Sequence, residues 1–104
     1  MSFKDIQIQF KDFDPSESLR HKISLIAEEL YFLAPSDSLL KLTVHKLQKK
    51  FKVRIKIASS TGHFGAETED VNLERATQWV REQVHKQIDR WRSSRFSSPE
   101  NVAS

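Results

Sequence analysis

Residues 40–57 read LKLTVHKLQKKFKVRIKI, and this stretch decides the fold. Apolar and polar side chains alternate along it twice, first over residues 40–45 and again over residues 51–57. A period of two is typical of a β-strand with one buried face and one face in water. The stretch therefore predicts two strands paired as a hairpin, with Lys49 and Lys50 at its tip or at the start of the second strand. The polar positions are mostly basic: Lys41, His45, Lys52, Arg54 and Lys56.

The sequence on either side adds two strands and two helices. Residues 6–11 alternate in the same way, and residues 63–68 can form a short fourth strand after a turn at 59–62. Apolar residues recur at helical spacing over 16–33, where Pro15 suits the start of a helix, and again over 71–93. Residues 94–104 are rich in serine and poor in apolar side chains, which predicts a disordered tail.

The predicted order is β-α-β-β-β-α, in one α+β domain over residues 1–93. Each predicted helix has one apolar stripe and each strand has one apolar face. The simplest assembly is therefore two layers, with both helices on one face of a four-stranded sheet. The other face of the sheet is expected to stay in water and to carry the basic residues of the hairpin.

Charge is segregated along the chain, which has a formal net charge of +3. No Asp or Glu lies between Asp37 and Glu67, so no acid nearby in sequence neutralises the basic residues of this interval. A second basic group, over residues 81–95, closes the last helix. Segregated Lys and Arg on a small domain indicate a polyanionic partner such as nucleic acid. A solvated charged face without a ligand is the simpler alternative.

Composition excludes several classes of function. The 104 residues include no Cys and 2 Gly, which excludes disulfides, thiolate chemistry, zinc fingers and the glycine-rich loops that bind dinucleotides or phosphates. The four His are not spaced as metal ligands, and no catalytic group is set beside a base. The first residues lack the apolar stretch of a signal peptide and no apolar run reaches about 20 residues, so we expect neither a signal peptide nor a membrane helix. We expect a cytoplasmic protein that is not an enzyme, with no cofactor, metal, small-molecule substrate or membrane contact.

Three motifs carry a resemblance to a known family over residues 5–93. Residues 16–20 (SESLR) open the first helix, residues 42–46 (LTVHK) and 64–67 (FGAE) lie in strands, and residues 86–92 (KQIDRWR) lie in the last helix. In order and spacing they resemble the short-form ribosome hibernation factors, also called ribosome-associated inhibitors or sigma-54 modulation proteins.

The resemblance implies a fold related to double-stranded-RNA-binding domains. It also implies a translation inhibitor of stress or stationary phase that occludes the mRNA and tRNA channel of the small ribosomal subunit, contacts 16S-type ribosomal RNA, and is a monomer off the ribosome. We expect the last helix to contribute more than the strands. The candidate RNA-binding residues are Arg20, Lys22, Lys46, Lys50, Lys52, Arg54, Lys56, Arg81, Lys86, Arg90 and Arg92.

Two departures from the family favour an alternative. Glu28 and Glu29 stand in the first helix, where the family tends to carry lysines, and the family's Asp-x-Tyr motif is replaced by residues 70–72, Asp-Val-Asn. The alternative is an interaction module of the same fold whose basic face binds an acidic protein. Of the two tryptophans, Trp91 is expected in the core, whereas Trp79 could stack on a base or pack at the rim.

Overall fold

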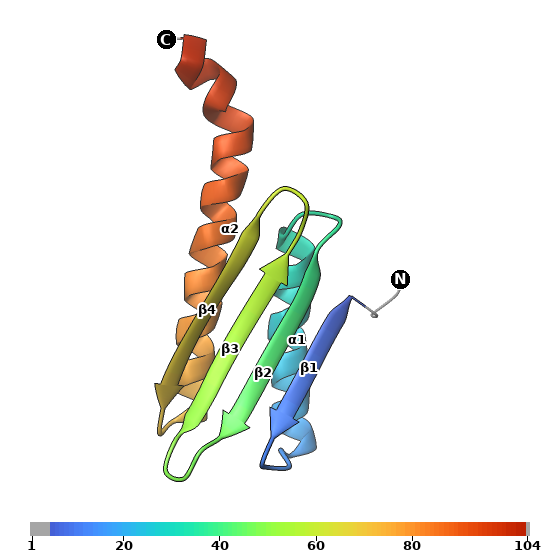
Figure 1. The fold of residues 1–104 in the computed structure, drawn as a ribbon, viewed down its shortest axis with the longest axis vertical. Helices are drawn as coiled ribbons and strands as arrows, with labels where there is room; N and C mark the ends of the chain where they lie inside the picture. The colour runs from blue at the N-terminus through green and yellow to red at the C-terminus, as the bar shows by residue number, and fades with distance from the viewer. Residues whose placement is uncertain (1–4, 104) are drawn as a thin grey trace.

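A mixed four-stranded sheet and two helices make up the fold. The structure, a computed structural model, describes residues 5–103, with side chains through Ser94. The elements are β1 (Ile6–Lys11), α1 (Glu17–Leu33), β2 (Leu39–Lys46), β3 (Phe51–Ala58), β4 (His63–Asp70) and α2 (Leu73–Ala103). The sheet order is β1-β2-β3-β4, with β1 parallel to β2 and the other neighbours antiparallel (Figure 1). The predicted element order is confirmed.

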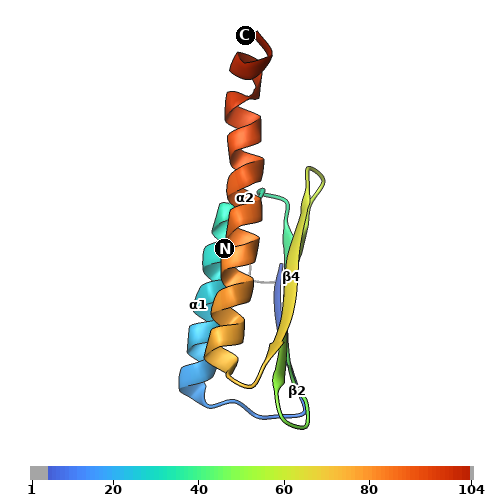
Figure 2. The same ribbon diagram turned by 90° about the vertical axis from the view of Figure 1, so that its left-hand side faces the viewer.

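Both helices cover the same face of the sheet, as Figure 2 shows edge-on. The apolar positions of the hairpin point into this layer: Leu42, Val53 and Ile55 are fully buried. Helix residues such as Leu30 and Val84 meet them in one core. The two-layer arrangement and the hydrophobic face of the hairpin are therefore as predicted.

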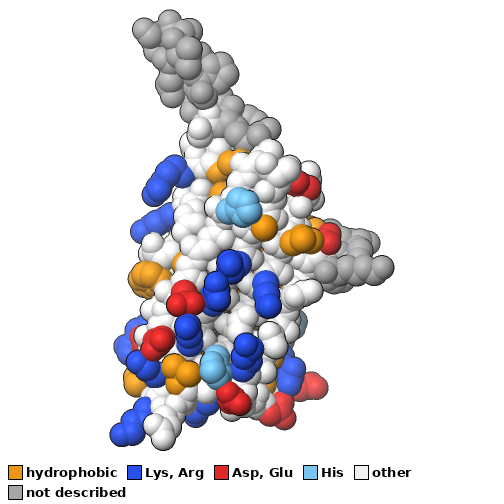
Figure 3. Space-filling view, viewed as in Figure 1, with side chains coloured by type: hydrophobic (Ala, Val, Ile, Leu, Met, Phe, Trp, Pro, Cys, Tyr) orange, Lys and Arg blue, Asp and Glu red, His pale blue; other side chains and the backbone are white. Residues whose placement is uncertain are grey.

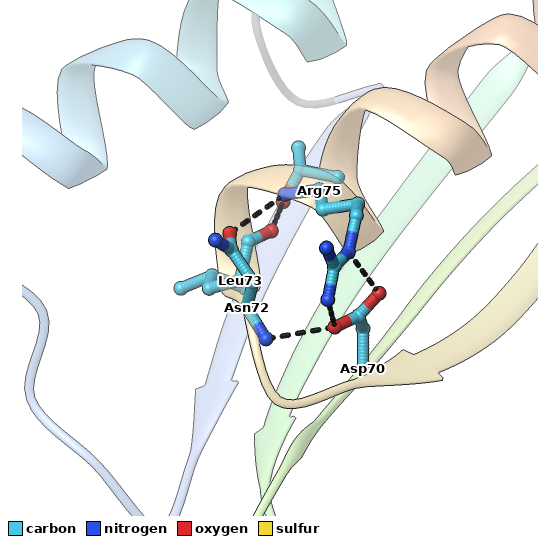
Figure 4. A network of polar contacts seen from close by, with 5 residues as sticks. Asp70, Asn72, Leu73 and Arg75 are labelled. Atoms are coloured by element: carbon cyan, nitrogen blue, oxygen red, sulfur yellow. Dashed lines mark hydrogen bonds and ion pairs between the residues drawn. The ribbon is translucent and has the colours of Figure 1, made fainter.

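The start of α2 is fixed by a polar network at the end of β4 (Figure 4). The Asn72 side chain caps the helix by accepting from the backbone N–H of Arg75 at 2.9 Å. The Arg75 guanidinium donates two hydrogen bonds to Asp70, at 2.7 and 2.9 Å. These bonds hold the pKa of the Asp70 carboxyl at about 2. The network joins the end of β4 to the first turn of α2.

At their C-terminal ends, β4 and α2 run beyond the predicted bounds. Strand β4 runs to Asp70 rather than stopping at 68, because it stays paired with β3 as far as Phe51. Helix α2 continues beyond the predicted end at 93 to Ala103. The serines after Trp91 lower helix propensity only slightly, so they do not end a helix by themselves. The side chains of 95–104 lie outside the described residues, and the division at residue 93 stays a prediction.

Candidate nucleic-acid interface

The open face of the sheet, opposite the helices, is a grid of side chains set by strand register. One row is Gln9, Thr43, Arg54 and Glu67, and the row below it is Lys11, His45, Lys52 and Glu69. The row above it is Gln7, Lys41, Lys56 and Gly65. The sequence prediction that this face is polar and basic is therefore confirmed for its centre.

A shallow hollow of about 300 Å³ lies in the middle of this grid. It is lined by Gln9, Lys11, Lys41, Thr43, His45, Lys52, Arg54 and Lys56, with no acid among them. Figure 3 shows the corresponding basic side chains gathered over β2 and β3, with carboxylates beside them over β4. The hollow is thus an electropositive depression in the open face.

Glutamates of β4 neutralise part of this charge. Glu67 lies 3.6 Å from the Arg54 guanidinium and 3.7 Å from Lys52 Nζ. Glu69 lies 2.6 Å from Lys50 Nζ, and this hydrogen bond lowers the pKa of the Glu69 carboxyl. The lack of acids nearby in sequence therefore does not leave the basic interval without neutralisation, because antiparallel pairing brings residues of another strand beside it.

The candidate residues at the lower end of the fold, Arg20 and Lys46, already make contacts within the protein. Arg20 of α1 forms an ion pair with Asp14 at 2.7 Å, and its guanidinium lies 5.2 Å from the centre of the Phe10 ring. Lys46 lies 5.0 Å from the centre of the Phe51 ring. Both side chains are exposed, so they can still reach a ligand. Cation–π contacts at exposed sites are worth about 0.5–1 kcal/mol, which a phosphate contact can replace.

Two candidates lie between the helices instead. Arg81 of α2 donates two hydrogen bonds to Glu29 of α1, at 2.6 and 3.2 Å, and both side chains are half-buried. Lys22 lies 2.6 Å from Glu74, and this contact lowers the pKa of the Glu74 carboxyl. Glu29, one of the two glutamates that depart from the family pattern, thus forms an ion pair that joins the two helices.

The remaining candidates, Lys86, Arg90 and Arg92, are exposed on α2. Within residues 5–94 the structure gives none of them a carboxylate partner. Lys86 and Arg90 are four residues apart and share one side of the helix. Arg92 follows Arg90 by two residues and therefore points about 200° away. Lys86 and Arg90 are the most available candidates.

Trp79 extends this pair into a stripe. It precedes Lys86 by seven residues, which is close to two turns, so it lies on the same side of α2. Its side chain is 45% exposed and stands outside the core. Trp91, by contrast, packs edge-on against Phe64, with ring centres 6.1 Å apart. The prediction for Trp91 is confirmed. We call Trp79, Lys86 and Arg90 the α2 stripe.

The candidate residues therefore do not share one surface. They divide among the open face, the lower end, the contact between the two helices and the exposed surface of α2, where Lys86 and Arg90 lie on the α2 stripe and Arg92 lies on another side. Sequence reasoning left Lys11 and Lys41 out of the candidate set, although both line the central hollow. Strand alternation had already placed both on the open face, and this was the signal that could have added them.

Other kinds of site find no support in the described part of the chain. No group of three or more His, Asp or Glu within it could hold a metal ion. None of its helices is both long and apolar enough to cross a membrane.

Comparisons with known proteins agree on the fold. No protein-family model and no curated protein matches the sequence. Among solved structures, the N-terminal domain of Protein Y from Thermus thermophilus is similar, with a TM-score of 0.70 and 16% identity over 82% of this chain and 94% of that one. A ribosomal subunit interface protein from Coxiella burnetii has a TM-score of 0.65 and 16% identity, covering 85% and 97%. The chain has the β-α-β-β-β-α fold of Protein Y, as predicted.

Proposed function

We propose that this protein is a ribosome-associated translation inhibitor that binds ribosomal RNA of the small subunit. The observation that carries the proposal is the α2 stripe, where Lys86 and Arg90 are exposed, lack a carboxylate partner within residues 5–94, and stand beside an exposed tryptophan. The fold, shared with Protein Y and with a protein named as a subunit interface protein, supports the ribosome as the source of that RNA.

The chemistry of the stripe suits an RNA backbone. Folded RNA hides its base edges in a deep and narrow major groove, so proteins contact mainly its phosphates and 2′-hydroxyls. Lys86 and Arg90 would each neutralise a phosphate and release counterions. The Trp79 ring adds a surface on which an unpaired base can stack. Inhibition would follow from occupancy of the mRNA and tRNA channel, with no covalent step.

The test is co-sedimentation of the protein with purified small ribosomal subunits over a salt series. The variant Lys86→Gln, Arg90→Gln removes two positive charges from the stripe. A matched control, Ser18→Glu, Ser36→Glu, lowers the net charge equally at two exposed positions away from α2. We expect saturable binding near one to one, strongly weakened in the stripe variant and kept in the control. The slope of log affinity against log salt should become shallower by about 0.7–0.9 for each phosphate that is no longer neutralised.

The opposite outcomes are also informative. If the folded wild-type protein fails to sediment with subunits at low salt, the proposal is wrong. If the control loses binding as fully as the stripe variant, only net charge matters and the stripe has no specific role. A shallow salt dependence would favour the alternative, in which the basic surface meets an acidic protein.

A further inference from the structure

Two lysines stand directly opposite each other in the middle of the open face. Lys41 of β2 pairs in register with Lys56 of β3, and both side chains are exposed. Like charges at directly opposed positions destabilise a sheet. Elsewhere on this face Glu67 relieves such repulsion, but among residues 5–94 no carboxylate is paired with Lys41 or Lys56. The pair therefore forms a cationic site that is suited to an anion.

The two neighbours of the lysine pair in the same row of the sheet do not cover it. On the β4 side, Lys56 is followed in register by Gly65, which has no side chain to cover it. On the β1 side, Lys41 is followed by the neutral Gln7. Within this row, neither neighbour of the lysine pair is acidic or bulky enough to cover the two ammonium groups.

An apolar shelf adjoins the lysine pair. Leu39 pairs with Ala58, and Ala58 pairs with His63, so these three side chains form the next row of the open face. Leu39 is 58% exposed, so it contributes accessible apolar area to this row. A hollow of about 470 Å³ is lined by the shelf and both lysines, and also by Asp5, whose carboxylate accepts a hydrogen bond from the Tyr31 hydroxyl at 3.2 Å. Apolar surface and positive charge thus share one depression.

We propose that this depression binds a segment of single-stranded RNA, with one base on the shelf of Leu39, Ala58 and His63 and adjacent phosphates on Lys41 and Lys56. A nucleotide carries a flat apolar ring and an anion within a few ångströms of each other, and the depression offers the complementary pair. The base must be unpaired, because a base inside a duplex cannot lie flat on a sheet. The site goes beyond the proposed function, since it is separate from the α2 stripe and needs no ribosome.

An RNA segment fits better than an acidic peptide. Carboxylate side chains would satisfy the two lysines, but they would leave the shelf beside them without a planar partner. Base stacking on an aromatic ring such as that of His63 contributes about 1–3 kcal/mol by alanine substitution. The 300 Å³ hollow shares Lys41 and Lys56 with this depression, so the backbone of a longer strand can continue toward Arg54 and Lys52.

The first experiment measures binding of a fluorescein-labelled ten-nucleotide oligoadenylate by anisotropy over a salt series. The variant Lys41→Gln, Lys56→Gln should bind at least about tenfold more weakly, with a salt slope shallower by about 1.4, because two phosphates would no longer be neutralised. The control Ser18→Glu, Ser36→Glu, with the same change in net charge, should stay within about twofold of wild type. Equal weakening in the two variants, or unchanged binding by the lysine variant, would overturn the proposal.

The second experiment tests the shelf. His63→Ala should weaken oligoadenylate binding by at least about fivefold, which is the lower end of the stacking contribution. It should leave binding of inorganic polyphosphate of similar charge unchanged, because that polymer has no bases. The proposal is wrong if polyphosphate or an oligoglutamate peptide binds wild-type protein as tightly as the oligonucleotide does. Circular dichroism and melting of each variant confirm folding.

The outcomes separate this site from the proposed function. If the protein binds oligoadenylate but not ribosomal subunits, the depression is an RNA site, and the RNA that it binds is not that of the ribosome. Subunit binding that depends on Lys86 and Arg90, together with no oligoadenylate binding, would support the α2 stripe and refute the depression.

Discussion

Replacing Gln87 tests how the exposed edge of β4 is held against α2. The Gln87 side chain donates a hydrogen bond to the backbone oxygen of Gly65 at 2.8 Å and accepts one from the Gly65 N–H at 2.9 Å. Because β4 is an edge strand, these backbone groups have no neighbouring strand on that side. The amide therefore satisfies both of them as a further strand would.

Gln87→Ala removes both hydrogen bonds. Each is neutral and partly buried, and such a bond contributes about 0.5–1.5 kcal/mol to the free energy of unfolding. The expected decrease in that free energy is therefore about 1–3 kcal/mol. For a domain of about 100 residues, each kcal/mol corresponds to about 4–8 °C in Tm. Urea and thermal unfolding followed by circular dichroism would measure both quantities.

Gln87→Glu tests whether the two hydrogen bonds to Gly65, rather than the packing of the side chain, stabilise this edge. The two side chains have nearly the same shape, but the ionised carboxylate can only accept, so one of its oxygens would face the Gly65 carbonyl. The protonated form can still donate, so folding should raise the pKa of the new carboxyl. Stability relative to wild type should therefore be fully recovered below the unfolded pKa of about 4.3 and be lost as pH rises through the folded pKa. Unchanged stability of Gln87→Ala, or wild-type stability of Gln87→Glu at pH 7, would refute the edge contact.

Three further predictions concern stability. Leu42→Ala empties a fully buried position and should cost about 2–5 kcal/mol in urea unfolding. The pKa of Asp70, about 2 in the folded protein beside Arg75, lies below its usual value, so its stabilisation is present above about pH 4 and is lost as pH falls through 2; Asp70→Asn should remove that dependence from an acid titration of stability. Lys56→Glu replaces like charges opposite Lys41 by an ion pair and should raise stability by about 0.2–1 kcal/mol, and a lower Tm would contradict the repulsion.

Most of the fold was predictable because local patterns agree with one another. Alternation fixed which side of β2 and β3 is buried, and helical spacing fixed the stripes of α1 and α2. The end of β4 was harder to predict, because residues 67–70 are polar side chains of similar character and gave no contrast between a buried and an exposed face. Their strand conformation depends on register with Phe51 of β3, which is a long-range contact.

The sequence predicted which types of residue lie on the open face, but it did not predict which charged residues lie opposite each other. A sequence shows that Lys52 and Arg54 face the same side as their neighbours in a strand. It does not show that Glu67 lies opposite Arg54, because that depends on the length of the turn after β3. Likewise, Arg81 was named a candidate RNA-binding residue, and the sequence did not show that Glu29 of the other helix lies beside it. Sequence counts of local charge thus overestimate the free cations wherever strands or helices are paired.

When these ion pairs are taken into account, RNA binding is expected at different places on the protein. Once Glu67, Glu69 and Glu29 are assigned to their partners, two places within residues 5–94 combine neighbouring unpaired cations with exposed apolar surface, the α2 stripe and the pair of Lys41 and Lys56. Each of the two adjoins exposed apolar surface, Trp79 in the first and Leu39 in the second. A nucleotide carries an anion and a flat ring close together, so both places present a surface complementary to it. Binding to one folded RNA at two places, with a backbone on the helix and a loose strand on the sheet, would explain both.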